Sequence, residues 1–311
     1  MNAATDLSRS ALMFLSRREA LKDAATRLSP VRELAGRFIA GEKLEDAVAA
    51  VKQLNSQGLT ASFDHLNEAV RTEDETREEV REYRRLLSRI DSEGAQANVS
   101  LKLTQCGLLF DRALALENAR AVVKEAAARG SFVRVDMEQS ALTQATLDTV
   151  RALHAEFGEL HVGAVLQSYL RRTEQDARAL CAERVRIRLC KGAYLEGPEV
   201  AFQDKREVDE SFVRTMKVLL DSGMYHGIAT HDEKMIDATL GYAARQQLPR
   251  STFEFQMLYG IRRDLQVHLA KEGFPVRIYV PYGRYWYPYF MRRLAERPAN
   301  LWFVVKNLFK G

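Results

Sequence analysis

The chain has 311 residues, of which 46% are hydrophobic and 28% charged, with a formal net charge of +4. These proportions are ordinary for a soluble globular protein, and the small charge without a Lys/Arg block argues against nucleic-acid binding. No stretch of about 18 apolar residues occurs, so no membrane span is expected. The three cysteines, Cys106, Cys181 and Cys190, are far apart, which is typical of reduced thiols in a cytoplasmic protein.

The first 58 residues predict a helical arm. Apolar residues recur at helical spacing over 11–15, over 21–28 and, beyond a Ser29-Pro30 cap, over 31–39. The remaining length suits a barrel of about 250 residues. We therefore expect an N-terminal helical arm over residues 1–58 and one barrel domain over residues 59–311.

Eight short apolar runs follow the arm, starting about 24 to 42 residues apart with helix-like stretches between them. The runs are Leu59–Phe63, Val99–Leu103, Phe132–Val135, His161–Leu166, Val185–Cys190, Gly227–Ala229, Thr252–Phe255 and Val276–Val280. Strands that alternate with helices form a parallel sheet, and eight such units predict an α/β fold, the (β/α)8 barrel.

Polar side chains stand at or just after the ends of these runs. They are Asp64, Lys102, Asp136, Gln167, Lys191, Thr230, His231, Gln256 and Tyr279. Barrels of this class carry their active sites at the C-terminal ends of the strands. The pattern therefore indicates an enzyme.

Several common site motifs are missing. The sequence contains no GxGxxG turn and no P-loop, and its histidines form no HxH or HExxH pair, so a Rossmann nucleotide site and a catalytic zinc site have little support. Ser140 and Ser168 lack the context of a nucleophile elbow. His65 and His231 each follow a strand and are candidates for the barrel mouth.

The candidate residues at the mouth are cationic and aromatic. They are Lys102, Arg188, Lys191, Tyr194, Tyr279, Arg292 and Arg293. Arginine forks fit a carboxylate, so the set predicts a small anionic ligand. Arg188 shares one strand face with Arg186 and needs an acidic side chain or an anionic ligand as its partner.

The segment after the eighth run is rich in aromatic residues, with five of them among residues 285–290. If this segment is helical, Tyr289, Arg292 and Glu296 share one face. The aromatic residues could form part of a site or a packing interface, and the pattern leaves both interpretations open.

In these positions the sequence resembles the proline dehydrogenase family, flavoenzymes that oxidise L-proline to Δ1-pyrroline-5-carboxylate. The resemblance covers nearly the whole chain. Its motifs are Val99–Leu103, Arg134–Glu138, Val165–Tyr169, Arg188–Tyr194, Ala229–His231, Phe253–Gln256, Val276–Gly283 and Tyr289–Arg293 with Glu296. It implies a distorted (β/α)8 barrel whose final helix covers the active site.

The resemblance also implies a role for each matching residue. Asp136 and Arg188 are the expected catalytic residues. The expected proline contacts are Lys102, Leu258, Tyr279, Tyr289, Arg292 and Arg293. Non-covalent FAD is expected to contact Gln167, Arg188, Cys190, Lys191, Gly192, Ala193, Tyr194, Lys205, Thr230, His231 and Glu296.

The family passes its electrons to a membrane quinone, which implies a cytoplasmic protein with transient peripheral contact at the inner face of the membrane. The chain ends at Gly311 without an aldehyde dehydrogenase half. It therefore resembles the monofunctional bacterial type, with a separate Δ1-pyrroline-5-carboxylate dehydrogenase acting next. Leu195 stands where the bifunctional members carry a tryptophan, and Asp204 where they carry an arginine, so the resemblance does not extend to that flavin stacking contact or that pyrophosphate contact.

Two other classes fit the residues alone. A Schiff-base aldolase would also use a barrel with a strand-end lysine, here Lys102 or Lys191. A non-catalytic barrel would bind proline-like acids without turnover. The visible spectrum separates the three classes, because only a flavoprotein is yellow and only an active one is bleached by L-proline.

Overall fold

A computed structural model of the chain describes residues 31, 34–67 and 70–296, with side chains as far as Arg293. The helices expected over 11–15 and 21–28 lie outside the described residues, as does part of the one expected over 31–39. Within the described part, no helix combines the length and apolar character that a bilayer crossing requires.

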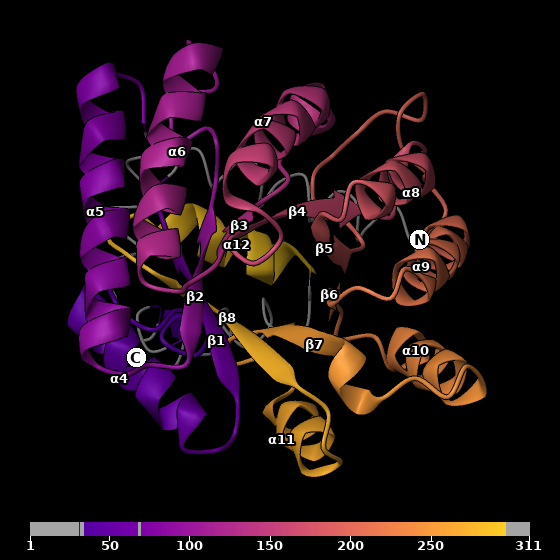
Figure 1. Cartoon of the computed structure of the whole chain (residues 1–311). Helices are drawn as coiled ribbons and strands as arrows, with labels where there is room; N and C mark the ends of the chain where they lie inside the picture. Colours follow the sequence, from indigo (N-terminus) through magenta and orange to yellow (C-terminus); the bar gives the residue numbers. More distant parts are fainter. Residues whose placement is uncertain (1–30, 32–33, 68–69, 297–311) are drawn as a thin grey trace.

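Eight parallel strands close into a barrel, in the same order around the ring as along the chain (Figure 1). They are β1 (Thr60–His65), β2 (Ala97–Leu101), β3 (Val133–Val135), β4 (Val162–Gln167), β5 (Arg186–Cys190), β6 (His226–Ala229), β7 (Phe253–Leu258) and β8 (Val276–Tyr282). Each predicted run overlaps a strand, so the expected (β/α)8 barrel is confirmed. Strands β7 and β8 run past the predicted ends at Phe255 and Val280.

Helices cover the outside of the barrel (Figure 1). They are α4 (Leu44–Asn55), α5 (Glu73–Ser92), α6 (Arg112–Ala128), α7 (Thr143–Phe157), α8 (Thr173–Ala182), α9 (Lys205–Asp221), α10 (Glu233–Arg245) and α11 (Arg263–Lys271). Helix α12 (Trp286–Glu296) lies instead over the middle of the ring (Figure 1). Asp111, Asp204 and Asp232 accept hydrogen bonds from first-turn N–H groups of α6, α9 and α10. The unusual Asp204 thus caps α9.

Helix α4 packs against β1 and β8 and contacts α5. Its buried face consists of Leu44, Ala47, Val48, Val51 and Leu54, at the helical spacing of an amphipathic surface helix. This helix falls within the arm expected over residues 1–58, so the described end of that arm packs directly on the barrel. The domain boundary at residue 58 remains a prediction.

The barrel interior is polar, whereas barrels of this class usually fill it with branched apolar residues. Arg188 on β5 forms hydrogen bonds with Ser100 on β2 and Gln256 on β7, strands that are not its neighbours. Such bonds cross the inside of the ring. The alternate residues of each strand, such as Phe63, face the helices and form the apolar core.

Two glycines make room for this polar interior. A Cβ atom at Gly163 would overlap the backbone oxygen of Arg186 and would lie 2.6 Å from Nη1 of Arg134. A Cβ atom at Gly227 would overlap the amide of Gln256. Large inward side chains therefore fit because their neighbours on the next strand have none.

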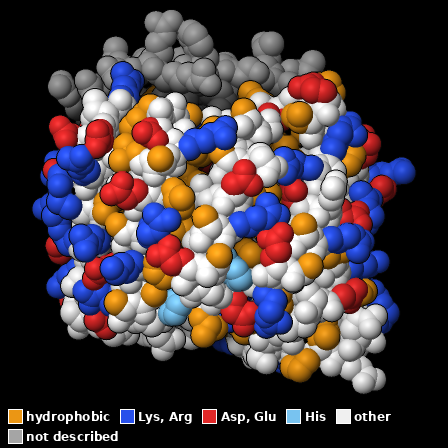
Figure 2. Space-filling view, turned by 45° about the horizontal axis from the view of Figure 1, so that its top comes forward, with side chains coloured by type: hydrophobic (Ala, Val, Ile, Leu, Met, Phe, Trp, Pro, Cys, Tyr) orange, Lys and Arg blue, Asp and Glu red, His pale blue; other side chains and the backbone are white. Residues whose placement is uncertain are grey.

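The outer surface mixes charges of both signs. Figure 2 shows Lys and Arg side chains interspersed with Asp and Glu over the face in view. Some form pairs within one helix, such as Arg85 and Glu82 of α5, whose atoms lie 2.7 Å apart. Exposed pairs of this kind contribute at most about 1 kcal/mol each, so we attribute the stability of the barrel mainly to the buried layer between strands and helices.

We predict that Gly163→Ala destabilises the protein by about 1–3 kcal/mol, because the added methyl group overlaps backbone that cannot turn away. The same change at Gly241, inside α10, meets only the flexible end of the Arg245 side chain, 3.4 Å from the added Cβ. It should instead stabilise the protein by about 0.5–1 kcal/mol. Urea unfolding of both variants measures the difference. Equal effects at the two sites would show that the interior tolerates a methyl group at Gly163.

Candidate active site

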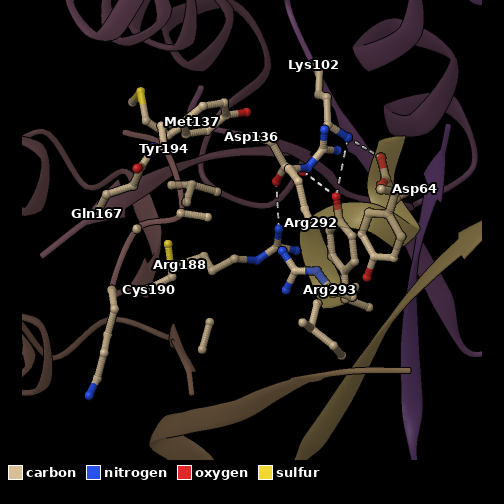
Figure 3. Close-up of a pocket in the computed structure, with 18 of the residues that line it drawn as sticks. Asp64, Lys102, Asp136, Met137, Gln167, Arg188, Cys190, Tyr194, Arg292 and Arg293 are labelled. Atoms are coloured by element: carbon tan, nitrogen blue, oxygen red, sulfur yellow. Dashed lines mark hydrogen bonds and ion pairs between the residues drawn. The ribbon is translucent and has the colours of Figure 1, made fainter. Parts of the chain in front are cut away.

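A cavity of about 1190 Å³ opens at the C-terminal ends of the strands. Pockets for one small ligand are usually about 300–1,000 Å³, so this cavity has room for a cofactor and a substrate together. Most of the predicted site residues line it: Lys102, Asp136, Gln167, Arg188, Cys190, Lys191, Gly192, Ala193, Tyr194, Thr230, His231, Leu258, Tyr279, Tyr289, Arg292 and Arg293. The close-up in Figure 3 shows Arg292 and Arg293 on α12 facing Lys102 and Asp136.

Two predicted site residues do not appear in the cavity lining. Lys205 lies beside it, with its Nζ 2.5 Å from Asp209 and 3.3 Å from Asp232. Asp232 lines the cavity and also accepts a 2.7 Å hydrogen bond from Lys191. Glu296 is the last residue of α12, and its side chain lies outside the described residues.

Lys102 lies among acidic and phenolic groups at the mouth. Its Nζ donates a hydrogen bond to the carboxylate of Asp64 and lies 3.5 Å from the hydroxyl of Tyr279. The Tyr279 hydroxyl donates in turn to Asp136 at 2.7 Å. Asp136 thus accepts on one oxygen from Tyr279 and on the other from Arg188, whose Nη1 lies 2.6 Å away.

These neighbours determine the protonation of Lys102. Burial alone would lower the pKa of the ammonium group, but the carboxylates of Asp64 and Asp136 outweigh burial and raise that pKa above its usual value. Burial and the nearby Asp136 raise the pKa of Tyr279 as well. Lys102 therefore remains a cation, and Tyr279 remains a hydrogen-bond donor.

Arg188 connects the mouth to the interior. It is 6% exposed, its guanidinium lies over the Tyr279 ring at 5.2 Å, and its N–H groups reach Asp136, Ser100 and Gln256. The expectation that Arg188 needs an acidic partner is confirmed by Asp136. A buried cation with a donor fork can fix a carboxylate and still present charge to the cavity.

Several features of the wall fit a polar cofactor. Gln167 is 2% exposed, and its Oε1 has no hydrogen-bond partner among the described residues, while its Nε2 donates to the backbone of Glu138. A buried oxygen of this kind favours a ligand that donates a hydrogen bond. Gly192 has a φ of +109°, and a side chain there would overlap the ring of Tyr169. This close packing brings the backbone of residues 192–194 to the cavity wall.

The sequence analysis missed some of the site. Asp64 stood at a strand end but was given no role, although it is the ion-pair partner of Lys102. Ser100 and Asp232 were also missed. Only their positions on or just after a strand could have signalled them, because nothing in the linear sequence shows which residue each one contacts.

The two mouth histidines have different positions. His231 lines the cavity, and its Nε2 accepts a 2.8 Å hydrogen bond from the backbone N–H of Leu258. His65 is not among the lining residues; its Nδ1 lies 2.9 Å from the carboxylate of Glu79 on α5. Only His231 is therefore a candidate ligand contact.

Helix α12 uses its aromatic residues in both of the ways left open by the sequence. Tyr289, and Tyr285 just before the helix, line the cavity. Trp286, Tyr287 and Phe290 pack with the segment of Val31, Leu34, Ala35, Phe38 and Ile39. The indole Nε1 of Trp286 also donates a 2.9 Å hydrogen bond to Glu42, so the residues before α4 hold the helix that carries Arg292.

The fold and the site define a class: a (β/α)8 barrel with a large, cation-lined cavity at its strand ends, as in barrel enzymes that bind an anionic substrate. The family model "Proline dehydrogenase" matches residues 47–306. The chain therefore belongs to the proline dehydrogenase family.

Curated relatives share most of their length with this chain. It is 43% identical over 281 residues to "Proline dehydrogenase" of Deinococcus radiodurans, covering 89% of this chain and 91% of the relative. It is 42% identical over 306 residues to "Proline dehydrogenase 1" of Bacillus subtilis, covering 97% and 99%. Among solved structures, proline utilization A from Bdellovibrio bacteriovorus, inactivated by N-propargylglycine, superposes with a TM-score of 0.80 at 26% identity, covering 85% of this chain and 32% of that one.

We predict that Asp64→Asn lowers the free energy of unfolding by about 3–5 kcal/mol, because it leaves the buried Lys102 without its nearest anion. Glu93→Gln is the matched control. It breaks 2.9 Å pairs with Lys52 and Arg89, whose side chains are 54% and 41% exposed, and should cost about 1 kcal/mol or less. Denaturant unfolding gives both values, and a small loss at Asp64 would contradict an ionised pair there.

Proposed function

We propose that this protein oxidises L-proline to Δ1-pyrroline-5-carboxylate, with non-covalently bound FAD as its cofactor and a membrane quinone as electron acceptor. The observation that carries the proposal is that Lys102, Arg292 and Arg293 line one cavity, with the two arginines facing the lysine. Membership of the proline dehydrogenase family supports the class of reaction. The product would pass to a separate Δ1-pyrroline-5-carboxylate dehydrogenase.

The three cations suit the carboxylate of proline. An arginine fork forms two parallel hydrogen bonds with a carboxylate, and a lysine adds a point charge. Tyr279, Tyr289 and Leu258 line the cavity beside these cations and offer apolar surface to the pyrrolidine ring. Binding at one end would fix the direction of the ring, and such positioning is worth several kcal/mol of the barrier.

The far part of the cavity suits the cofactor. When bound, FAD supplies the redox chemistry, accepting a hydride from C5 of proline at its N5. The unpartnered Oε1 of Gln167 would accept a hydrogen bond from it, and Lys191 with the 192–194 backbone would contact its polar groups. Thr230 and His231 also line the cavity, and Arg188 offers a fixed positive charge.

Asp136 acts in this proposal by fixing its neighbours. Each of its oxygens accepts a hydrogen bond, one from Tyr279 and one from Arg188. The carboxylate thereby holds one group of the proposed substrate site and one group of the proposed cofactor site in a fixed relation. That relation determines where the proline ring lies against its hydride acceptor.

The Schiff-base alternative is disfavoured by the carboxylates around both candidate lysines. Lys191 forms ion pairs with Asp209 and Asp232, and Lys102 lies beside two acids. An aldolase lysine needs a lowered pKa to attack a carbonyl as the neutral amine. The carboxylates around Lys102 have the opposite effect and raise its pKa. A barrel that binds proline without turnover differs from the proposal only in its spectral response.

The proposed contact with the membrane is peripheral. The loops that follow β2 and β5 begin at the mouth of the barrel. They carry the exposed side chains of Leu109, Phe110 and Leu195. Apolar side chains and a slightly cationic chain suit a brief contact with an anionic lipid surface. Such contact would bring a quinone near the cavity.

We expect the purified protein to be yellow and to lose its absorbance near 450 nm when L-proline is added without oxygen. Because the cofactor is expected to bind without a covalent bond, heat-precipitated protein should release the yellow colour into the supernatant. A colourless protein that does not take up added FAD would contradict the proposal. Colour that remains in the pellet would contradict the non-covalent attachment alone.

We predict that Arg292→Ala and Arg293→Ala each lower kcat/KM for proline about 10- to 150-fold, the effect of about 1.5–3 kcal/mol for one bond to a charged group. The loss should appear mainly as a higher KM, with FAD retained. Lysine at either position should restore only part, since a point charge cannot make the forked contact.

Prolinamide provides the control, because it lacks the carboxylate charge. It should be a poor substrate for the wild type and should lose little more in either variant. Steady-state kinetics with both substrates measure this difference. Equal losses for proline and prolinamide in Arg293→Ala would assign that arginine to the fold instead.

A further inference from the structure

Beneath Arg188, a chain of hydrogen bonds crosses the barrel interior from β8 through β7 to β5. Arg277 donates to both oxygens of Glu254, at 2.8 and 3.0 Å. The Nε2 of Gln256 donates to Glu254 at 2.5 Å, and the Oε1 of Gln256 accepts from Nε of Arg188. Glu254, Gln256 and Arg188 are 3%, 5% and 6% exposed, so water does not replace these bonds.

Glu254 fixes the direction of this chain. Burial raises the pKa of its carboxyl group, but the charge and hydrogen bonds of Arg277, together with a 2.9 Å bond from Tyr225, outweigh burial and leave that pKa below its usual value. An ionised carboxylate only accepts hydrogen bonds. The amide of Gln256 must therefore turn its NH₂ group toward Glu254, and its oxygen is left facing Arg188.

The opposite orientation of the amide would place two donors against each other. The NH₂ group of Gln256 would meet the Nε–H of Arg188, and the guanidinium would lose one of its three partners. Close packing at Gly227, where a Cβ atom would lie 2.8 Å from Cδ of Gln256, leaves the amide little space to relieve this contact by moving. The direction of the amide is thus coupled to the position of the guanidinium.

We propose that Glu254 is a positioning residue for Arg188. By imposing one orientation on the Gln256 amide, it holds the Arg188 guanidinium in the direction that faces the cavity. The proposal rests on the proposed function for the task of Arg188, which is to place a positive charge beside the bound cofactor. Glu254 itself is not among the residues that line the cavity.

Two nearly isosteric substitutions test the donor–acceptor direction of these hydrogen bonds. In Glu254→Gln, the new side chain can turn either its oxygen or its NH₂ group toward Gln256, because Arg277 donates to both oxygen positions of residue 254. The single orientation of the Gln256 amide is then no longer imposed. In Gln256→Glu, two carboxylates face each other. In the double variant, the amide introduced at 254 donates to the carboxylate introduced at 256, which also accepts from Arg188, so every donor again has an acceptor.

We expect each single variant to lower kcat/KM for proline by about ten-fold or more, the effect of losing one hydrogen bond to a charged group. Glu254→Gln should also shift the midpoint potential of the bound flavin. The double variant should recover most of the loss. Glu174→Gln is the matched control, because Glu174 pairs with arginines, at 2.7 and 3.2 Å, as Glu254 pairs with Arg277, but lies on the outer surface.

A second comparison separates positioning from a general effect on the fold. In an Arg188→Lys background the Nε donor is absent, so Glu254→Gln should have little further effect on kcat/KM. An undiminished effect there would overturn the proposal, and so would a double variant that is no better than either single one. Either result would show that Glu254 acts independently of Arg188.

The proposed function and the positioning role of Glu254 can be contradicted separately. A wild-type protein that takes up no flavin would contradict the proposed function only. Urea unfolding of the flavin-free proteins would then test the same donor–acceptor direction, with a lower midpoint for each single variant and recovery in the double variant. Additive midpoint losses in the double variant would overturn the proposed orientation of the amide.

Discussion

The guanidinium of Arg188 is the interaction on which the rest of the interior depends. From β5 it reaches Asp136 on the β3 side, Ser100 on β2 and Gln256 on β7. A buried cation is costly unless hydrogen bonds satisfy it completely. The interior meets this requirement with polar residues from three other parts of the ring, which explains why apolar layers do not fill the barrel.

Because the interior is filled with polar groups, the outward and inward faces of the strands have different roles in the structure. The outward faces of the strands and the buried faces of the helices form the apolar core and provide most of the stability. The inward faces instead fix the orientation of their polar side chains, because hydrogen bonds between fixed partners have defined geometry. Small residues such as Gly163 and Gly227 connect the two parts, since they let long side chains cross the ring.

At the mouth of the barrel, acidic and basic side chains are also paired, but cations outnumber anions once the arginines of α12 are included. Asp64 and Asp136 accompany Lys102 and Arg188, so two acids and two bases lie close together within the wall. The arginines of α12 line the same cavity, where they face Lys102 and Asp136 and add further positive charge. An incoming anion therefore meets a positive end of the cavity without requiring an unpaired cation in the barrel wall.

Much of the fold could be predicted from the sequence, because each strand is a short apolar run and the runs recur with regular spacing. The same logic found Lys102, Asp136 and Gln167, which stand where strands end. It could not find Asp64 as the partner of Lys102 or Gln256 as the partner of Arg188, since these pairs are 38 and 68 positions apart. Such contacts depend on which strands face each other across the ring.

The sequence also could not show how the ends of the described chain meet. The aromatic residues after β8 predicted either a site or an interface, and only the segment around Phe38 explains why both occur. Lys205 was assigned from resemblance alone, and the acidic residues Asp209 and Asp232 that bind its side chain are distant from it in the sequence or on the next turn of its helix. The position of Asp232 beside Lys205 therefore could not be inferred from the sequence.

The hydrogen bond between Trp286 and Glu42 joins residues 244 positions apart. Closing so large a loop has an entropic cost before any contact is gained, so α12 is expected to dock only after the ring of strands has formed. The same helix should also be among the first elements to open in the folded protein, because local opening occurs where few elements share the packing. A carboxylate bound between α12 and Lys102 would then tie this helix to β2. The substrate would complete the structure that recognises it, and amide hydrogens of α12 would exchange more slowly when it is bound.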